Sequence, residues 1–220
     1  MIRAVVFDFG GVLITPITNQ IGTVAERHGR SVPEVLEVLL GPRDSGEHPW
    51  HRAERGELAV ADIQGQLGPW ADAAGLNLTG DELDVLLAAG AYTHIRPVHD
   101  RIVTLRRDGI KTALLTNTFA EFRPTMERDV DFGLFDVVIE SFAVGARKPE
   151  PAIYEATQAA LGVAPGEIAY LDDFDQNLVP AAALGWTTIH VLDPVVALAE
   201  LDALLAGDAR DIPTDQYGDL

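Results

Sequence analysis

Polar residues follow four of the apolar runs in this sequence, at points where buried strands would end. They comprise three carboxylates, a hydroxyl, an amide and an ammonium: Asp8, Thr116, Asn117, Lys148, Asp172 and Asp173. Such a set suits a hard divalent cation held by oxygen atoms, together with a phosphoryl group. The residue types therefore indicate metal-assisted chemistry on a phosphorylated compound, provided that the fold brings them together.

Five short apolar runs predict the strands of one sheet. They are residues 3–8, 111–116, 135–141, 168–172 and 187–192. Helical patterns between them, each closed by a glycine, cover residues 98–107, 151–161 and 177–184. This alternation favours an α/β fold with a doubly wound parallel sheet and helices on both faces. Because ligands bind at the carboxyl ends of parallel strands, we expect the polar residues to converge there.

One long segment interrupts the alternation. It has helical patterns and no convincing strand, with Ser31 and Thr79 as expected N-caps. The patterns cover residues 17–28, 32–40, 60–67 and 80–89. A helical block inserted after the first strand suggests a lid over the sheet. We therefore expect three parts: a core of residues 1–15 and 96–206, a helical cap of residues 16–95, and a frayed acidic tail of residues 207–220.

Composition and charge narrow the class of protein. The 220 residues include 16 Lys and Arg against 34 Asp and Glu, a net charge of −18. This field repels phosphate backbones and anionic lipid, so we expect neither nucleic acid nor a membrane as a partner. The absence of cysteine excludes thiolate nucleophiles and cysteine-ligated metals. No signal peptide or membrane span is evident, so we expect a cytoplasmic protein, as a monomer or a homodimer.

Four segments, taken in order, resemble the motifs of the haloacid dehalogenase (HAD) superfamily. They are Asp8 to Leu13 (DFGGVL), Leu115 to Asn117 (LTN), Lys148 with Pro149, and Asp172 to Asn177 (DDFDQN). The helical insertion lies where that superfamily has its type-one cap. The string from Gly145 to Tyr154 is similar to the branch related to the amino-terminal phosphatase domain of epoxide hydrolases. The resemblance covers about the whole chain except its tail, and implies a Rossmann-like core.

The resemblance implies a role for each matching residue near the phosphate. Asp8 matches the nucleophile, whose carboxylate attacks the substrate to form a covalent aspartyl intermediate. Lys148 would offset the negative charge of the nucleophile and the phosphate together. Thr116 and the backbone N–H of Asn117 would take phosphoryl oxygens, and Gly11 is a further expected substrate-binding position. The implied activity is that of a phosphatase on a small phosphorylated metabolite.

The resemblance also implies Mg²⁺ as the cofactor. Asp8, the backbone carbonyl of Gly10, and Asp173 with Asp172 match the positions that hold the ion, directly or through water. Asn177 matches a residue that orients this part of the site. Two adjacent carboxylates are costly unless a cation or exposure relieves their repulsion, which independently favours a metal at Asp172 and Asp173.

The sequence departs from the phosphatase pattern at Gly10. Phosphatases of the superfamily carry a second aspartate there, which protonates the leaving group and then activates water. Positioned acid–base catalysis contributes about 10²- to 10⁴-fold in rate, so phosphomonoester turnover should be slow unless something replaces the acid. Asp172, Asp175, His48, His51 or a good leaving group are the candidates.

Two other functions remain open. Dehalogenases of the superfamily also lack the second aspartate, because halide needs no protonation. They generally lack the metal constellation, however, which Asp172, Asp173 and Asn177 retain here. The second alternative is a catalytically retired protein that keeps the fold for binding or regulation. The presence of Asp8 argues mildly against that alternative.

Several other residues near these motifs are interpreted as structural. His48 and His51 are expected mainly to be surface or packing residues of the cap, and Trp50 is expected to pack within the cap. His190 lies in an apolar strand and is interpreted as structural. Arg147 is compatible with either a solvated charge or a contact to substrate.

Overall fold

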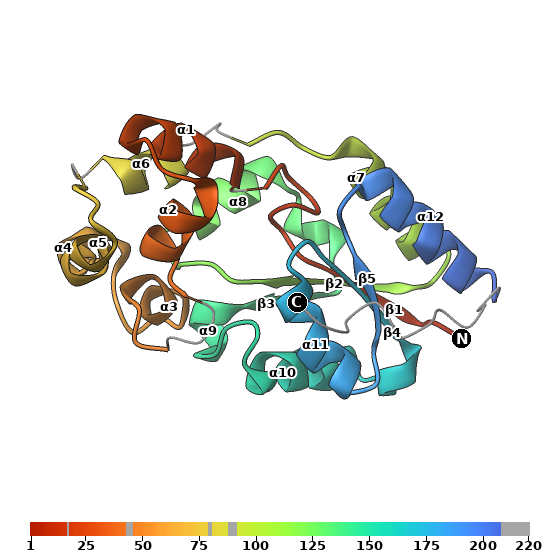
Figure 1. The fold of residues 1–220 in the computed structure, drawn as a ribbon. Helices are drawn as coiled ribbons and strands as arrows, with labels where there is room; N and C mark the ends of the chain where they lie inside the picture. Colours follow the sequence, from red (N-terminus) through yellow and green to blue (C-terminus); the bar gives the residue numbers. More distant parts are fainter. Residues whose placement is uncertain (17, 43–45, 79–80, 88–91, 208–220) are drawn as a thin grey trace.

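The protein has a five-stranded parallel sheet in the order β3-β2-β1-β4-β5 (Figure 1). The computed structural model describes residues 1–16, 18–42, 46–78, 81–87 and 92–207. The strands are β1 (Ala4–Phe7), β2 (Lys111–Thr116), β3 (Val137–Glu140), β4 (Ile168–Asp172) and β5 (Thr187–His190). Each strand lies within one of the five predicted runs, so the parallel sheet is confirmed.

The register brings the polar strand ends together. Central strand β1 lies between β2 and β4, and Phe7 is paired with Leu114 on one side and Leu171 on the other. The residues that follow these three strands therefore emerge next to one another. Parallel pairing thus places Asp8 between the ends of β2 and β4, as the strand order requires.

Helices cover both faces of the sheet (Figure 1). The longer ones are α7 (Arg96–Arg107), α10 (Pro151–Leu161), α11 (Asp175–Ala183) and α12 (Pro194–Leu205). Side chains alternate between the faces of a strand, and β1 shows the result. Val5 and Phe7 share a hydrophobic cluster with residues of α7 and α12, whereas Ala4 and Val6 share another with residues of α10 and α11. This arrangement confirms the doubly wound α/β fold.

Some core elements were not predicted. They are α12, the short helices α8 (Arg123–Asp129) and α9 (Ser141–Val144), and the 3₁₀ turns η1 (Phe132–Leu134) and η2 (Pro165–Glu167). The start of helix α12 could have been recognised from Asp193, its N-cap. The Asp193 side chain accepts hydrogen bonds from the N–H groups of Val195 and Val196. The pattern Asp-Pro before an apolar segment is a signal for such a helix start.

Among the described residues between 18 and 87, six helices form a separate helical block. They are α1 (Thr18–His28), α2 (Val32–Leu39), α3 (Pro49–Glu54), α4 (Val60–Gln66), α5 (Gly68–Ala74) and α6 (Glu82–Leu87). Their buried apolar side chains form a hydrophobic cluster distinct from the two on the sheet. Helices α1, α2, α4 and α6 match predicted patterns, whereas the short α3 and α5 were missed. Ser31 is the N-cap of α2, as predicted, and Thr79 lies outside the described residues.

The chain enters and leaves the helical block through adjacent segments. The N–H of Thr15 donates to the carbonyl of Thr93, and the N–H of Ile95 donates to the carbonyl of Leu13. The block lies beyond the carboxyl ends of the strands, over the edge where the polar residues emerge (Figure 1). Residues 208–220 of the expected acidic tail lie outside the described residues. No helix in the described ranges is long and apolar enough to cross a membrane.

Candidate active site

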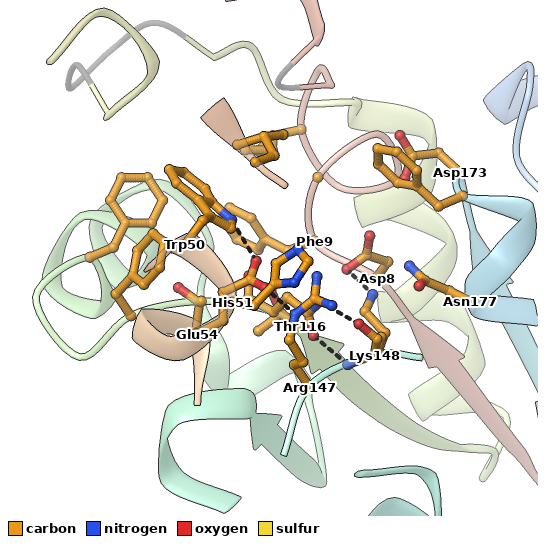
Figure 2. Close-up of a pocket in the computed structure, with 18 of the residues that line it drawn as sticks. Asp8, Phe9, Trp50, His51, Glu54, Thr116, Arg147, Lys148, Asp173 and Asn177 are labelled. Carbon is orange, nitrogen blue, oxygen red and sulfur yellow. Dashed lines mark hydrogen bonds and ion pairs between the residues drawn. The ribbon is translucent and has the colours of Figure 1, made fainter. Parts of the chain in front are cut away.

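A cavity of about 230 Å³ lies where the sheet meets the helical block (Figure 2). Its lining includes most of the site residues expected from the sequence: Asp8, Gly10, Thr116, Asn117, Lys148, Asp173 and Asn177. They come from four segments that are far apart in the chain. Gly11 and Asp172 are the two expected site residues that do not line the cavity.

Lys148 is a buried ammonium between two carboxylates. Its side chain is 2% exposed, and Nζ lies 2.7 Å from Asp8 Oδ1 and 2.7 Å from Asp172 Oδ2. Burial alone would lower the pKa of Lys148, but the charges of Asp172 and Asp8 outweigh it and raise the pKa to about 12. Burial raises the pKa of Asp8 to about 7, against the opposing effect of the Lys148 ammonium. The lysine therefore holds its charge at the position where a phosphate would add more negative charge.

Asp173 supplies a carboxylate oxygen without a protein partner. Its Oδ1 is buried and makes no hydrogen bond within the described part of the chain. One oxygen each from Asp8, Asp172 and Asp173 lie within 4.8 Å of one another. Burial, reinforced by the charges of Asp8 and Asp172, raises the pKa of Asp173 to about 8. An oxygen-ligated divalent cation fits this donor set, because it would pair the orphaned oxygen and relieve the repulsion.

Asp172 has a different environment from its neighbour Asp173. It is fully buried. Besides Lys148, its carboxylate accepts hydrogen bonds from Tyr170 Oη, the N–H of Phe174 and Nδ2 of Asn177. Asp172 was expected beside Asp173 at the ion, directly or through water, and its oxygens are the more fully occupied of the two. Its oxygens position the lysine and the asparagine, although one of them belongs to the carboxylate cluster.

Asn117 connects the end of β2 to the segment that carries Lys148. Its Nδ2 donates to the carbonyl of Lys148 at 3.0 Å, and its Oδ1 accepts from the N–H of Lys148 at 2.7 Å. Thr116, the last residue of β2, is buried beside it and lines the cavity. His190 pairs through Nε2 with the carbonyl of Asp173 at 3.0 Å. The structural interpretation of His190 is thus confirmed, because this contact supports the loop that carries Asp173.

The adjacent glycines Gly10 and Gly11 differ in the space available for a side chain. Gly11 has φ +73°, and a Cβ at this position would lie 2.1 Å from Asp173 Oδ2. Gly11 was expected to bind substrate, but its place in the structure is against Asp173, where only a glycine fits. A Cβ at Gly10 would meet nothing within 4 Å, and Gly10 lines the cavity. The position of the missing acid therefore has room for a side chain.

Helix α3 contributes polar groups to the opposite side of the cavity. Trp50, His51 and Glu54 all line it. Glu54 accepts a hydrogen bond from Trp50 Nε1 at 2.9 Å and is ion-paired with Nε of Arg147, which lies directly before Lys148 (Figure 2). Sequence reasoning left Arg147 open and passed over Glu54. The spacing of Trp50 and Glu54, one turn apart on a helix, was the available signal.

His48, the N-cap of α3, has the packing role that was expected. It is fully buried, its ring lies 4.7 Å from that of Trp70, and it does not line the cavity. Trp50 also packs as expected, edge-on against Phe119. His51 is also buried and, unlike His48, is part of the cavity wall.

The remainder of the lining is largely apolar. It includes side chains from both the helical block and the core: Phe9, Ile14, Leu36, Leu40, Phe119, Phe122, Met126 and Phe174. The cavity therefore has a charged end at Asp8, Lys148 and Asp173 and an apolar remainder. Such an arrangement can hold a charged group in one orientation next to an uncharged organic group.

Comparison with known proteins identifies relatives over nearly the whole chain. A family model described as a haloacid dehalogenase-like hydrolase matches residues 2–185. The chain is 35% identical over 208 residues to acyl-CoA dehydrogenase family member 10 of Mus musculus, covering 92% of this chain and 19% of that protein. It is 34% identical over 228 residues to bifunctional epoxide hydrolase 2 of Rattus norvegicus, covering 96% and 40% respectively. The chain thus spans less than half the length of these two relatives.

Other relatives are closer to this chain in length. Sesquiterpene phosphatase astK of Aspergillus oryzae is 26% identical over 208 residues, which cover 92% of this chain and 96% of that protein. A HAD family enzyme of Bacteroides thetaiotaomicron, solved in complex with magnesium and inorganic phosphate, has a TM-score of 0.61 at 19% identity. That match covers 86% of this chain and 94% of the other, and it shows the shared fold. From the family model and the fold together, the chain belongs to the haloacid dehalogenase-like hydrolases.

Proposed function

We propose that this hydrolase is a Mg²⁺-dependent phosphatase that acts on a small phosphate monoester. The observation that carries the proposal is the charged end of the cavity, where Asp8, Lys148 and the orphaned oxygen of Asp173 meet. A phosphoryl group needs a nucleophile in line with the leaving group and positive charge around its oxygens. The named phosphatase among the relatives supports the same class of reaction.

The protein residues divide the work between attack and charge balance. An oxygen of Asp8 attacks phosphorus, and the bond from phosphorus to the leaving oxygen breaks, which yields an aspartyl phosphate. Lys148, positioned by Asp172, offsets the negative charge, while Thr116 and the N–H of Asn117 bind phosphoryl oxygens. Mg²⁺, held by Asp8, the Gly10 carbonyl and Asp173, would supply further positive charge at the same end.

The organic part of the substrate is proposed to be uncharged and mainly apolar. Beyond the charged end, the wall consists largely of side chains such as Leu36, Leu40, Phe119 and Phe122. The charges of Glu54 and Arg147 neutralise each other, so this ion pair does not offer a free cation to a second anionic group. A relative named as a sesquiterpene phosphatase supports a hydrocarbon-rich organic group.

The helical block and its flanking residues form the proposed cap, residues 16–95. We assign this cap the role of enclosing and selecting the substrate. Its helices supply the wall opposite the charged end, including Leu36, Leu40 and Trp50. Closure of such an element excludes water from the reacting groups. Substitutions in this wall should therefore change the choice of ester more than the chemistry at Asp8.

The experiment that tests the function is phosphate release with and without Mg²⁺. The substrates are p-nitrophenyl phosphate, hexyl phosphate and glucose 6-phosphate, and Asp8→Asn is the control. We expect Mg²⁺-dependent release that the Asp8→Asn variant loses, with hexyl phosphate preferred over the sugar phosphate. Release equal to that of the control on every ester would refute the proposal. Metal-independent halide release from 2-chloropropionate would instead establish the dehalogenase alternative.

A further inference from the structure

Gly10 leaves the proposed reaction without a group to protonate the leaving oxygen. We propose that His51, on helix α3, supplies this proton, and the inference rests on the phosphatase function proposed above. His51 lines the cavity, and only 3% of its surface is exposed to solvent. The structure supports this assignment by its geometry and by the surroundings of the other titratable groups.

In-line displacement determines the side on which the acid must lie. The nucleophile and the leaving oxygen occupy opposite sides of phosphorus. Asp8 attacks from the sheet, so the leaving oxygen points away from the strand ends, toward the helical block. His51 is on that block, on the side of the cavity across from Asp8 (Figure 2). The helix therefore places an imidazole on the side where the proton is needed.

Three of the alternatives considered from the sequence lie outside the cavity wall. Asp172 is fully buried, and both its oxygens already accept hydrogen bonds. Asp175 does not line the cavity, and its Oδ1 accepts from the N–H of Gln176 at 2.7 Å. His48 uses both ring nitrogens, one with Val38 and one with Trp50. Burial lowers the pKa of His48 to about 4, so this ring is neutral near pH 7.

Two titratable groups that do line the cavity lie on the nucleophile's side. Lys148 is held between Asp8 and Asp172 by an ion pair to each of them. Asp173 belongs to the carboxylate cluster that fits the cation. Neither group is across from Asp8, where the leaving oxygen would emerge.

The remaining titratable groups of the wall are engaged elsewhere. Glu54 accepts hydrogen bonds from Trp50 and from the guanidinium of Arg147. An arginine does not give up its proton in proteins. The hydroxyl of Tyr92 donates to a backbone carbonyl, and burial raises its pKa to about 12. Imidazole is the side chain most often used for general acid–base catalysis, and His51 supplies one on the required side of the cavity.

The proton balance closes over the two steps. As the phosphorus–oxygen ester bond breaks, its electron pair moves to the leaving oxygen, which takes a proton from the imidazolium of His51. The product alcohol leaves, and a neutral imidazole faces the aspartyl phosphate. Water then attacks phosphorus, gives a proton to His51, and the bond to Asp8 breaks. Inorganic phosphate, the carboxylate of Asp8 and the imidazolium are regenerated.

The test separates leaving groups that need a proton from those that do not. His51→Gln removes the acid but keeps a polar side chain of similar length, and His94→Gln, at an exposed histidine outside the cavity, is the matched control. We expect kcat on hexyl phosphate to fall about 10²- to 10⁴-fold in His51→Gln, with p-nitrophenyl phosphate affected by less than about tenfold. The His94→Gln variant should retain wild-type rates on both esters.

A rescue experiment distinguishes an acid from a residue that only packs. Gly10 has space for a side chain, so Gly10→Asp in the His51→Gln background should restore turnover of hexyl phosphate. Equal losses on both esters without rescue, or no loss on either, would overturn the role of His51. The comparison with Asp8→Asn tests the proposed function separately. If the wild-type protein releases no more phosphate than this variant from any ester, the proposed function itself fails. Should His51→Gln not fold, His51→Asn with the same rescue decides the question.

Discussion

The adjacent glycines after β1 offer a sharp test of the metal site. A Cβ at Gly11 would lie 2.1 Å from Asp173 Oδ2 and 2.3 Å from its Cγ, and the backbone there has φ +73°. A Cβ at Gly10 meets nothing within 4 Å. Gly11→Ala must therefore displace the Asp173 carboxylate, whereas Gly10→Ala leaves both that carboxylate and the Gly10 carbonyl in place.

The expected sizes follow from two separate effects. A left-handed backbone conformation costs a non-glycine residue about 1–2 kcal/mol, which lowers the Tm of a domain of this size by roughly 2–8 °C in Gly11→Ala. A bound ion at 100 times its Kd stabilises the native state by about 2.7 kcal/mol, or roughly 5–11 °C in Tm. The Gly10→Ala variant should keep this gain with Mg²⁺, and the Gly11→Ala variant should lose it.

Thermal unfolding followed by circular dichroism, with EDTA or with saturating Mg²⁺, measures both effects. The wild-type protein and Gly10→Ala should show the same Mg²⁺-dependent rise in Tm. Asp173→Ala should resemble Gly11→Ala in its lack of response. If Gly11→Ala keeps the full rise, then Asp173 does not hold the ion and the inference from its orphaned oxygen is wrong.

Three further predictions concern charge in and around the cavity. Because the pKa values of Asp8 and Asp173 are raised to about 7 and 8, the native metal-free protein binds more protons than the unfolded chain between about pH 4 and 8. Its stability should therefore fall as the pH rises through this window, and equal urea midpoints at pH 5 and pH 8 would contradict the shifts. Lys148→Met should abolish phosphate release and lower the free energy of unfolding by about 3–5 kcal/mol at pH 8, because it leaves buried carboxylates unpaired. A decrease of less than about 1 kcal/mol in urea unfolding would show that these carboxylates do not need the lysine for stability. Arg147→Met and Glu54→Gln should couple by more than about 0.5 kcal/mol in a double-mutant cycle, whereas additive effects would mean that their ion pair contributes nothing.

The sheet and the longer helices other than α12 could be predicted because their physical signals are local. Strands buried on both faces of a parallel sheet are continuous apolar runs, and β1, β2 and β4 have this pattern. Helix ends marked by glycine are also local, as at Gly162, which closes α10 in the left-handed conformation. The short helices α3 (PWHRAE) and α5 (GPWADAA) each contain a single large apolar side chain besides proline, so neither shows the apolar spacing that marks the equally short α4.

The candidate site divides in the same way between sequence and tertiary structure. Asp8, Lys148 and Asp173 could be identified from the sequence, because residue types at strand ends and their order along the chain already indicate phosphoryl chemistry. The different environments of Asp172 and Asp173 could not, since neighbouring residues at a strand end point in different directions and only packing decides which of them is buried.

The polar wall opposite Asp8 depends on tertiary structure alone. Glu54 and Arg147 are 93 residues apart in the chain, and His51 belongs to a helix whose sequence shows no apolar period. Their meeting in one cavity requires the helical block to pack over the strand ends. The sequence by itself thus determined the fold class through local patterns and, through its resemblance to a family, indicated a class of enzyme and a candidate nucleophile. The packing of the block on the sheet decided which side chains line the cavity opposite Asp8, because contacts between distant segments have no local signal.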